Sequence, residues 1–471
     1  MPMTRYSDFF REKKFFLIFI FILFVYLISL YSGPVVNDEK QSEYNARNIV
    51  INDYLGFSIS SDTGNYMRLA NNPSLLFENE RYVKDRKLTA GNVGLSRPAS
   101  FITVYLISKP IEKMLNLLSF SNQKIFDNIK NSLNSVYRLS GIDQTVDDTV
   151  SNLENFVSTY LAWIIFNIII IFLAFFLFCK SLKISVFKMS SYSHTGLWLG
   201  VFFIINDITK IYFVSPSPAI LTLLAVSLTI FSCELIKGNS RLKILLWFSF
   251  LFGFLNLFYE IFFAPFIVMI IFYMKIKFFD NKKKLAFFFS EAKFYFFCIL
   301  LFLIPYLFWV GIVEIFFGGF FHFGVHDNPG FRILKNDFLT IFTYIINFAV
   351  YGYSLAVLSL FPIIFIFIFL LFYYFFTKKV IEVNKDYLLI GIIYTFTILL
   401  FFSIYGQIGV RHTLGTILIF LPLIYSILPS LDKTKEGRHI FFTAGFFLIY
   451  SFFVARKVFP FGEGILRNPL I

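Results

Sequence analysis

The sequence predicts an all-α polytopic membrane protein, with about eleven transmembrane helices and a large helical extracytoplasmic loop after the first of them. The chain of 471 residues is 57% hydrophobic and 21% aromatic, with a mean hydropathy of +0.72, whereas soluble domains are about 45–50% apolar. Long apolar runs recur along it, and short clusters of Lys and Arg separate them. The net charge of +13 is therefore interpreted as membrane topology and not as nucleic-acid binding.

The first apolar run, from Phe15 to about Ser32, predicts an uncleaved membrane anchor. It is long enough to cross the bilayer, and no A-x-A cleavage pattern follows it. With the basic residues Arg5 to Lys14 in the cytoplasm, residues 33–155 form the large extracytoplasmic loop.

That loop is expected to be helical and to lie on the membrane. The segment "FITVYLIS", residues 101–108, is too short to cross. The stretches 109–120 and 121–155 place apolar residues at mixed three- and four-residue intervals, which is typical of amphipathic helices in the interface plane.

The later spans follow from the alternation of apolar runs with basic clusters, and the whole chain is expected to form one integral membrane domain, residues 1–471. The predicted crossings lie at about 156–179, 196–213, 219–236, 292–315, 353–376, 387–405, 413–430 and 440–455. Residues 316–352 form a second extracytoplasmic loop, in which 338–352 is a surface or half-membrane helix because another crossing would break the alternation.

The apolar stretch 244–275 needs a separate interpretation. As one helix it would be about 48 Å long, too long for one crossing, and it would leave Glu260 near the middle of the bilayer at a cost of about 2–3.5 kcal/mol. It would also put Lys275 and Lys277 on the wrong side. A hairpin of two short helices that turns near Asn256 to Glu260 removes these problems.

This topology predicts that the chemistry occurs outside, because the cytoplasmic loops hold little besides short basic clusters. The polar residues expected on the outer face are Asp62, Arg97, Asp207, Lys210, Glu260, His322, His326, Asp327, Arg332, Arg411 and His412. No GxxxxGK[ST], GxSxG or HExxH pattern supports nucleotide hydrolysis or hydrolase chemistry. The three cysteines lie in apolar segments without CxxC spacing, which indicates neither a disulfide framework nor a thiolate metal site.

The order of these features resembles the GT-C superfamily of integral membrane glycosyltransferases, which includes oligosaccharyl, protein O-mannosyl and lipid A aminoarabinose transferases. "SDTGNYMRLA", residues 61–70, is similar to the family's pattern of an acid at the start of the outer loop. "LSRPASF", residues 95–101, stands where members carry a Pro-rich segment, with one Pro fewer, and "GVRHTLGTILIFLPLIYSIL" is similar to their R-Y-L-L-P-type segment. At the hairpin tip many members carry Lys or Arg, where this chain has Tyr259 and Glu260.

The resemblance implies transfer of a sugar from a polyprenyl-phosphate carrier to an envelope glycan, lipid or protein, at the outer face of a bacterial inner (plasma) membrane. Asp62 matches the family's acid, which deprotonates or orients the acceptor, and Arg411 is the best-placed cation for the departing lipid phosphate. Each residue also has a structural interpretation. Asp62 could cap the helix that follows it, and Arg411 could anchor its span at headgroup depth.

The remaining candidates for substrate or phosphate contact are Tyr66, Arg97, Lys210, Glu260, His322, His326 and His412. Glu260 is a second acid, an ion-pair partner for Arg or Lys, or a packed residue at a helix turn, and Lys210 could simply mark the outer end of a span. "HFGVHDNPGFR", residues 322–332, spaces two His and an acid as a divalent-metal face would on a helix, but its Gly and Pro favour a loop. No cofactor is assigned, and a divalent metal is an open option.

Two rival functions fit the composition. A polysaccharide polymerase or ligase usually places its main polar loop late in the chain, whereas this loop comes early. A transporter or lipid flippase usually shows related halves and interrupted helices, and no internal repeat is evident here.

Overall fold

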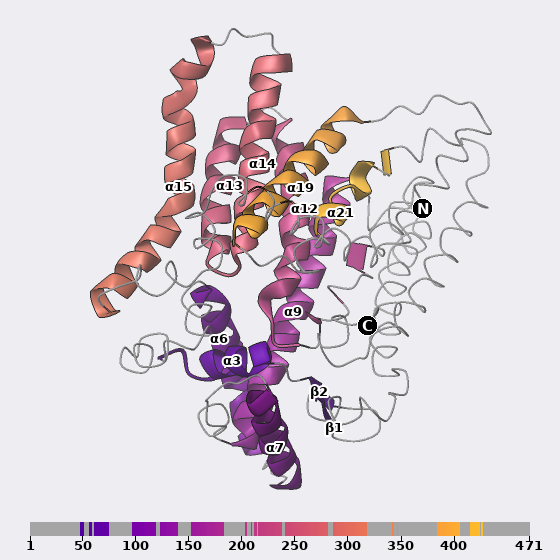
Figure 1. The fold of residues 1–471 in the computed structure, drawn as a ribbon, viewed down its shortest axis with the longest axis vertical. Coiled ribbons are helices and arrows are strands. Elements are labelled where there is room, and N and C mark those ends of the chain that lie inside the picture. Colours follow the sequence, from indigo (N-terminus) through magenta and orange to yellow (C-terminus); the bar gives the residue numbers. More distant parts are fainter. Residues whose placement is uncertain are drawn as a thin grey trace, which may run out of the picture.

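The computed structural model describes the parts of the chain that carry the bundle and much of the predicted outer loop. The described residues are 48–50, 56–58, 61–74, 97–118, 123–139, 152–182, 203–204, 209, 212–213, 215–237, 241–280, 286–317, 342, 346, 384–405, 415–423 and 425–426. They are mostly helical (Figure 1).

Within these residues, four helical segments are long and apolar enough to cross a membrane, which is compatible with an integral membrane protein. They are Leu153–Ser181, Pro218–Ile236, Glu260–Phe278 and Ala292–Ile312. The first is α9; the second joins the short 3₁₀ helix η2 (Pro218–Ile220) to α12 (Leu221–Ile236); and the fourth lies in α15 (Ala286–Phe317). The other predicted spans lie wholly or partly outside the described residues, apart from α19 (Lys385–Tyr405), which matches the predicted span 387–405.

The predicted hairpin is confirmed. Helix α13 (Arg241–Asn256) ends at the predicted position, and a turn leads into the 3₁₀ helix η3 (Glu260–Phe262) and α14 (Phe263–Met274). A π-helical turn, η4 (Lys275–Asp280), follows. At 16 residues, α13 is about 24 Å long, and it packs against both α14 and α15.

The helices alternate in direction as the basic clusters predict. Lys237 after α12 and Lys275 after α14 both contact Asp386 at the start of α19, at the end of the bundle here called the basic end. Residues 97–100 contact the turn between α13 and η3 at the opposite end, here called the loop end. Which side of a membrane each end faces stays a prediction.

Helix α12 is the centre of the bundle and α15 lies at its periphery. In the apolar segment Pro218–Ile236, which contains α12, 83% of the most apolar stretch is buried. In the segment Ala292–Ile312 of α15 this share is 22%, and a row of Phe, Ile and Leu side chains is exposed. Small residues let α9 and α12 approach closely, since the Ser227 hydroxyl donates to the Ala174 carbonyl at 2.7 Å.

The predicted outer loop contributes three described helices, α3 (Ser61–Asn71), α6 (Pro98–Leu117) and α7 (Gln123–Leu139). All three lie at the lower end of Figure 1. Helix α6 runs unbroken through "FITVYLIS" and past Pro110, so the two segments distinguished in the sequence form one helix.

The described residues are mostly helical, as the all-α class predicts, and they also contain one short β-hairpin that the sequence did not predict. Strands β1 (Asn48–Val50) and β2 (Gly56–Ser58) form an antiparallel hairpin in which Ile49 pairs with Phe57. Each strand has three residues, too few for an alternating apolar pattern to be detected.

Helices α13 and α15 touch through Gly253, where a Cβ atom would overlap the backbone carbonyl of Phe302. We expect Gly253→Ala to destabilise the protein by about 1–3 kcal/mol or more, because backbone atoms must move apart. A Cβ at Gly311, on α15, meets nothing within 4 Å. Gly311→Ala should therefore be neutral or stabilising by up to about 1 kcal/mol. Thermal unfolding of both variants in detergent compares them, and equal effects would contradict this packing.

Candidate functional site

The Arg97 side chain joins three segments that are far apart in the sequence. Its Nε donates to Glu260 Oε2 at 2.6 Å, and its Nη2 donates to Glu260 Oε1. Its Nη1 donates to the Tyr66 hydroxyl at 2.9 Å, and its Cζ lies 4.7 Å from the centre of the Tyr259 ring. The guanidinium thus makes a bidentate ion pair, a third hydrogen bond and a cation–π contact.

Local sequence explains how Arg97 comes to lie there. Pro98 occupies the first turn of α6, where a missing N–H is tolerated, so Arg97 stands at the entrance to the helix. The next two residues tie the helix to the hairpin turn: the Ala99 N–H donates to the Leu257 carbonyl at 3.3 Å, and the Ser100 hydroxyl donates to the Phe258 carbonyl at 2.8 Å. The start of α6 is therefore bonded to the turn by backbone and side chain alike.

Tyr66 links this ion pair to α3. Its ring packs against Phe101 and Trp163, with centroids 5.7 and 6.1 Å away, and it is 4% exposed. Helix α3 is further attached to α9 by a hydrogen bond from Thr159 to Asn71.

Asp62 lies in the first turn of α3, because the helix begins at Ser61. Asp62 therefore does not precede the helix, but a carboxylate in the first turn can still accept free backbone N–H groups and favours the helix dipole, so its structural role stays a prediction. Positions 62 and 66 are four residues apart and share one face of α3.

Burial lowers the pKa of the Arg97 guanidinium, but the negative charge of Glu260 and its hydrogen bonds raise it more, so the pKa lies above its ordinary range. The Arg97 side chain is 7% exposed and that of Glu260 is 19% exposed. Both side chains therefore keep their charge although they are largely removed from water, because each contacts a partner of opposite charge.

Of the nine residues predicted to form the site, the structure brings Tyr66, Arg97 and Glu260 together. It confirms the ion-pair interpretation of Glu260. Asp62 lies on the adjoining helix, and Lys210, His322, His326, Arg411 and His412 lie outside the described residues. Among the residues that are described, no three His, Cys, Asp or Glu side chains gather as a metal ion would require. Cys179, Cys233 and Cys298 are buried and free.

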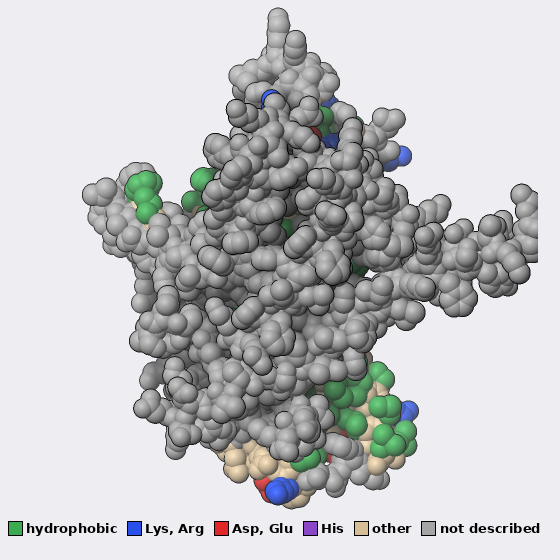
Figure 2. Space-filling model, turned by 90° about the vertical axis from the view of Figure 1, so that its right-hand side faces the viewer, with side chains coloured by type: hydrophobic (Ala, Val, Ile, Leu, Met, Phe, Trp, Pro, Cys, Tyr) green, Lys and Arg blue, Asp and Glu red, His purple; other side chains and the backbone are tan. Residues whose placement is uncertain are grey.

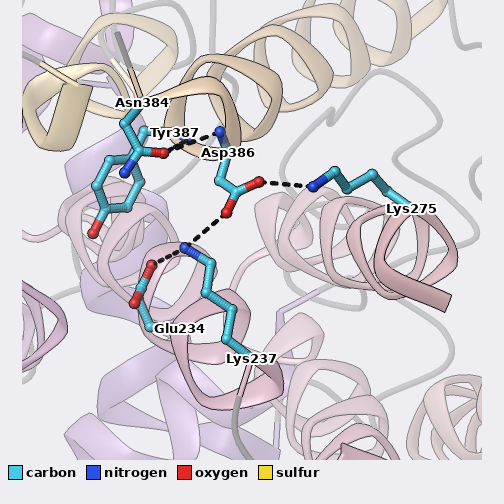
Figure 3. A network of polar contacts seen from close by, with 6 residues as sticks. All are labelled: Glu234, Lys237, Lys275, Asn384, Asp386 and Tyr387. Carbon is cyan, nitrogen blue, oxygen red and sulfur yellow. Dashed lines mark hydrogen bonds and ion pairs between the residues drawn. The ribbon is translucent and has the colours of Figure 1, made fainter. Parts of the chain in front are cut away.

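A second polar network ties three helices together at the basic end (Figure 3). Asp386 accepts from Lys275 at 3.0 Å and pairs with Lys237 at 3.1 Å, and Lys237 also pairs with Glu234 at 2.7 Å. Asn384 caps α19 by accepting from the backbone N–H groups of Asp386 and Tyr387. This network fixes the ends of α12 and α14 against the start of α19.

Sequence reasoning missed both the Tyr259 ring under Arg97 and the role of Asp386. Asp386 had a detectable signal, since the predicted topology puts an acid just before a span on the side that holds Lys237 and Lys275. The stacking of Tyr259 had none, because nothing local to residue 259 indicates where Arg97 will lie.

The fold and these contacts define a mainly helical chain with membrane-length apolar helices and a buried ion pair where the loop meets the bundle. No protein-family model matches the chain, and no curated protein or solved structure does either.

The buried pair can be tested with a double-mutant cycle. We expect Arg97→Met and Glu260→Gln each to lower the free energy of unfolding by about 3–5 kcal/mol, because each leaves its partner's charge buried. The double variant should lose much less than the sum. Chemical denaturation in detergent measures all three.

The control cycle uses Lys109 and Glu112, a more exposed pair on α6 with an Nζ to Oε2 distance of 2.8 Å. Alanine substitutions there should show a coupling of about 0.2–1 kcal/mol. Additive effects of the Arg97 and Glu260 substitutions would contradict a strong ion pair.

The network at the basic end predicts a pH dependence. Burial raises the pKa of the Asp386 carboxyl, but the hydrogen bond from Lys275 and the charge of Lys237 lower it more, so the pKa lies below its ordinary 3.8. Ionised Asp386 therefore stabilises the fold above its unfolded-state pKa, and this contribution is lost as the pH falls through the lower native-state pKa.

We expect Asp386→Asn to lower stability at neutral pH by about 1–2 kcal/mol. Its difference from the parent chain should shrink as the pH falls below about 4. Thermal unfolding at neutral pH and at a pH below about 4 measures the stability difference between variant and parent chain. Asp127→Asn on the exposed face of α7 is the control. A difference that stays constant with pH would exclude Asp386 as the titrating group.

Proposed function

We propose that the chain is a membrane glycosyltransferase that transfers a sugar from a polyprenyl-phosphate carrier to an envelope acceptor on the extracytoplasmic face. The observation that carries the proposal is the meeting of Tyr66, Arg97 and Glu260 at the loop end of an apolar bundle. These residues were selected individually, from topology and from the GT-C resemblance, and they come from segments up to 194 residues apart in the chain. Their contact supports a common site at the start of the outer loop.

In this proposal Asp62 acts as the base. Its carboxylate takes the proton of the acceptor hydroxyl, the acceptor oxygen bonds to the anomeric carbon of the sugar, and the bond from that carbon to the phosphate oxygen breaks. The electron pair leaves with the polyprenyl phosphate, whose charge needs a cation. One displacement of this kind inverts the configuration of the anomeric carbon.

The contacts of Arg97 support a positioning role for it in this proposal. Its guanidinium already bonds the Glu260 carboxylate and the Tyr66 hydroxyl, so we propose that it holds α3 in place and that Arg411 supplies the cation for the leaving phosphate. Tyr66 shares the face of α3 that carries position 62, which connects the ion pair to the proposed base.

The proposal is tested by replacing Asp62. Cells that produce Asp62→Asn should lose the transferred sugar and accumulate the lipid-linked sugar, because the variant cannot accept the proton, while the amount of protein in the membrane stays unchanged. Mass spectrometry of envelope glycans and lipid-linked intermediates, compared with cells that lack the gene, measures both. Asp127→Asn on α7 is the matched control and should behave like the parent chain.

Transfer that persists in Asp62→Asn at the parental level would refute the proposed role of this acid. Flux of a lipid-linked sugar across vesicles without any altered acceptor would instead favour the transporter or flippase alternative.

A further inference from the structure

The inner face of helix α6 is buried against the helix bundle. Phe101, Val104 and Ser108 are 2% exposed or less, and the Phe101 ring lies edge-on to Trp163 of α9, with centroids 6.3 Å apart. The helix is therefore held along its inner side by α9, in addition to the hairpin turn at its start.

The outer face of α6 is apolar and exposed. The outer stripe of α6 consists of Ile102, Leu106, Met114 and Leu117, together with Leu118 directly after the helix; Leu106 is 64% and Leu117 79% exposed. Positions 102, 106 and 117 fall on one side of a helix with 3.6 residues per turn. Lys109, which pairs with Glu112, and Lys113 are exposed on the side of this stripe that carries Ile102.

Helix α7 shows the opposite arrangement. Its apolar residues Ile129 and Leu133 are 0% exposed and belong to the core, and its exposed residues are polar, among them Lys124, Asp127 and Asn128. The apolar face of α7 is thus buried inside the protein, whereas α6 has a second apolar face that stays exposed.

The stripe lies where membrane-length helices begin. The first residues of α6 bond to the turn directly before the segment Glu260–Phe278, and the inner face of α6 packs on Trp163 of the segment Leu153–Ser181. Figure 2 shows exposed hydrophobic side chains beside a Lys or Arg side chain at the lower end of the molecule, where α3, α6 and α7 lie in Figure 1.

We propose that the outer stripe of α6 is a lipid-binding surface that lies in the interface of the bilayer, with Lys109 and Lys113 against the phosphates of anionic phospholipids. An apolar face flanked by lysines is the composition of interfacial helices, and lysines near an anionic surface are attracted to it. Helices α9 and α13 expose apolar side chains as well, with Ile169 and Trp247 53% and 69% exposed. This inference does not depend on the proposed glycosyltransferase activity.

The experiment places an environment-sensitive fluorophore on the full chain at Leu117→Cys and, as the control, at Asn128→Cys on the polar face of α7. Both positions are exposed, so neither substitution disturbs packing, and the parent chain gives the labelling background of the three buried cysteines. The proteins are reconstituted into phosphatidylcholine vesicles that contain nitroxide-labelled lipid, with and without phosphatidylglycerol.

We expect nitroxide lipid to quench the label at position 117 several-fold more than the label at 128, and phosphatidylglycerol to increase this quenching. Lys109→Gln/Lys113→Gln in the Leu117→Cys chain should abolish the increase. Equal quenching at both positions would overturn the proposal. So would a label at 117 that is shielded from water but not quenched by lipid, which would indicate a protein partner or a second copy. An unchanged phosphatidylglycerol effect in the lysine variant would overturn the assignment to anionic headgroups.

Discussion

The contact on which the loop end depends is the ion pair of Arg97 with Glu260. Removing two charges from water is costly, and such a pair persists only where further groups satisfy the remaining donors. Here the Tyr66 hydroxyl and the Tyr259 ring do so. One guanidinium therefore determines how α6 begins, how the turn between α13 and η3 is covered, and where the buried face of α3 lies.

The basic end is held by the same kind of interaction in a more exposed form, with Asp386 between Lys237 and Lys275. Between the two ends the described helices are joined by close packing, as where α13 approaches α15 at Gly253, and by buried hydrogen bonds such as those of Asn167 and Ser227. Apolar helices surrounded by lipid gain little from hydrophobic burial against one another. The charged contacts at the two ends thus set the register in which these apolar helices pack.

The sequence predicted the hairpin of α13 and α14 because a single helix would have put Glu260 in hydrocarbon and Lys275 on the wrong side. It also selected Tyr66, Arg97 and Glu260 individually, through topology and resemblance. It did not predict that they touch, because Arg97 and Glu260 are 163 residues apart and no local pattern encodes their distance. The hairpin of β1 and β2 was missed because its strands are very short. Residues 101–108 and most of the stretch 109–120, which were distinguished in the sequence, form one helix, in which packing on α9 outweighs the backbone hydrogen bond lost at Pro110.

The central claim is that Arg97 holds the loop helices on the bundle, and backbone amide exchange tests it most directly. With Arg97→Met, we expect faster hydrogen–deuterium exchange in α3 and in the first turns of α6, while exchange in α12 at the centre of the bundle stays at the parental rate. Unchanged exchange in both loop helices would contradict the account.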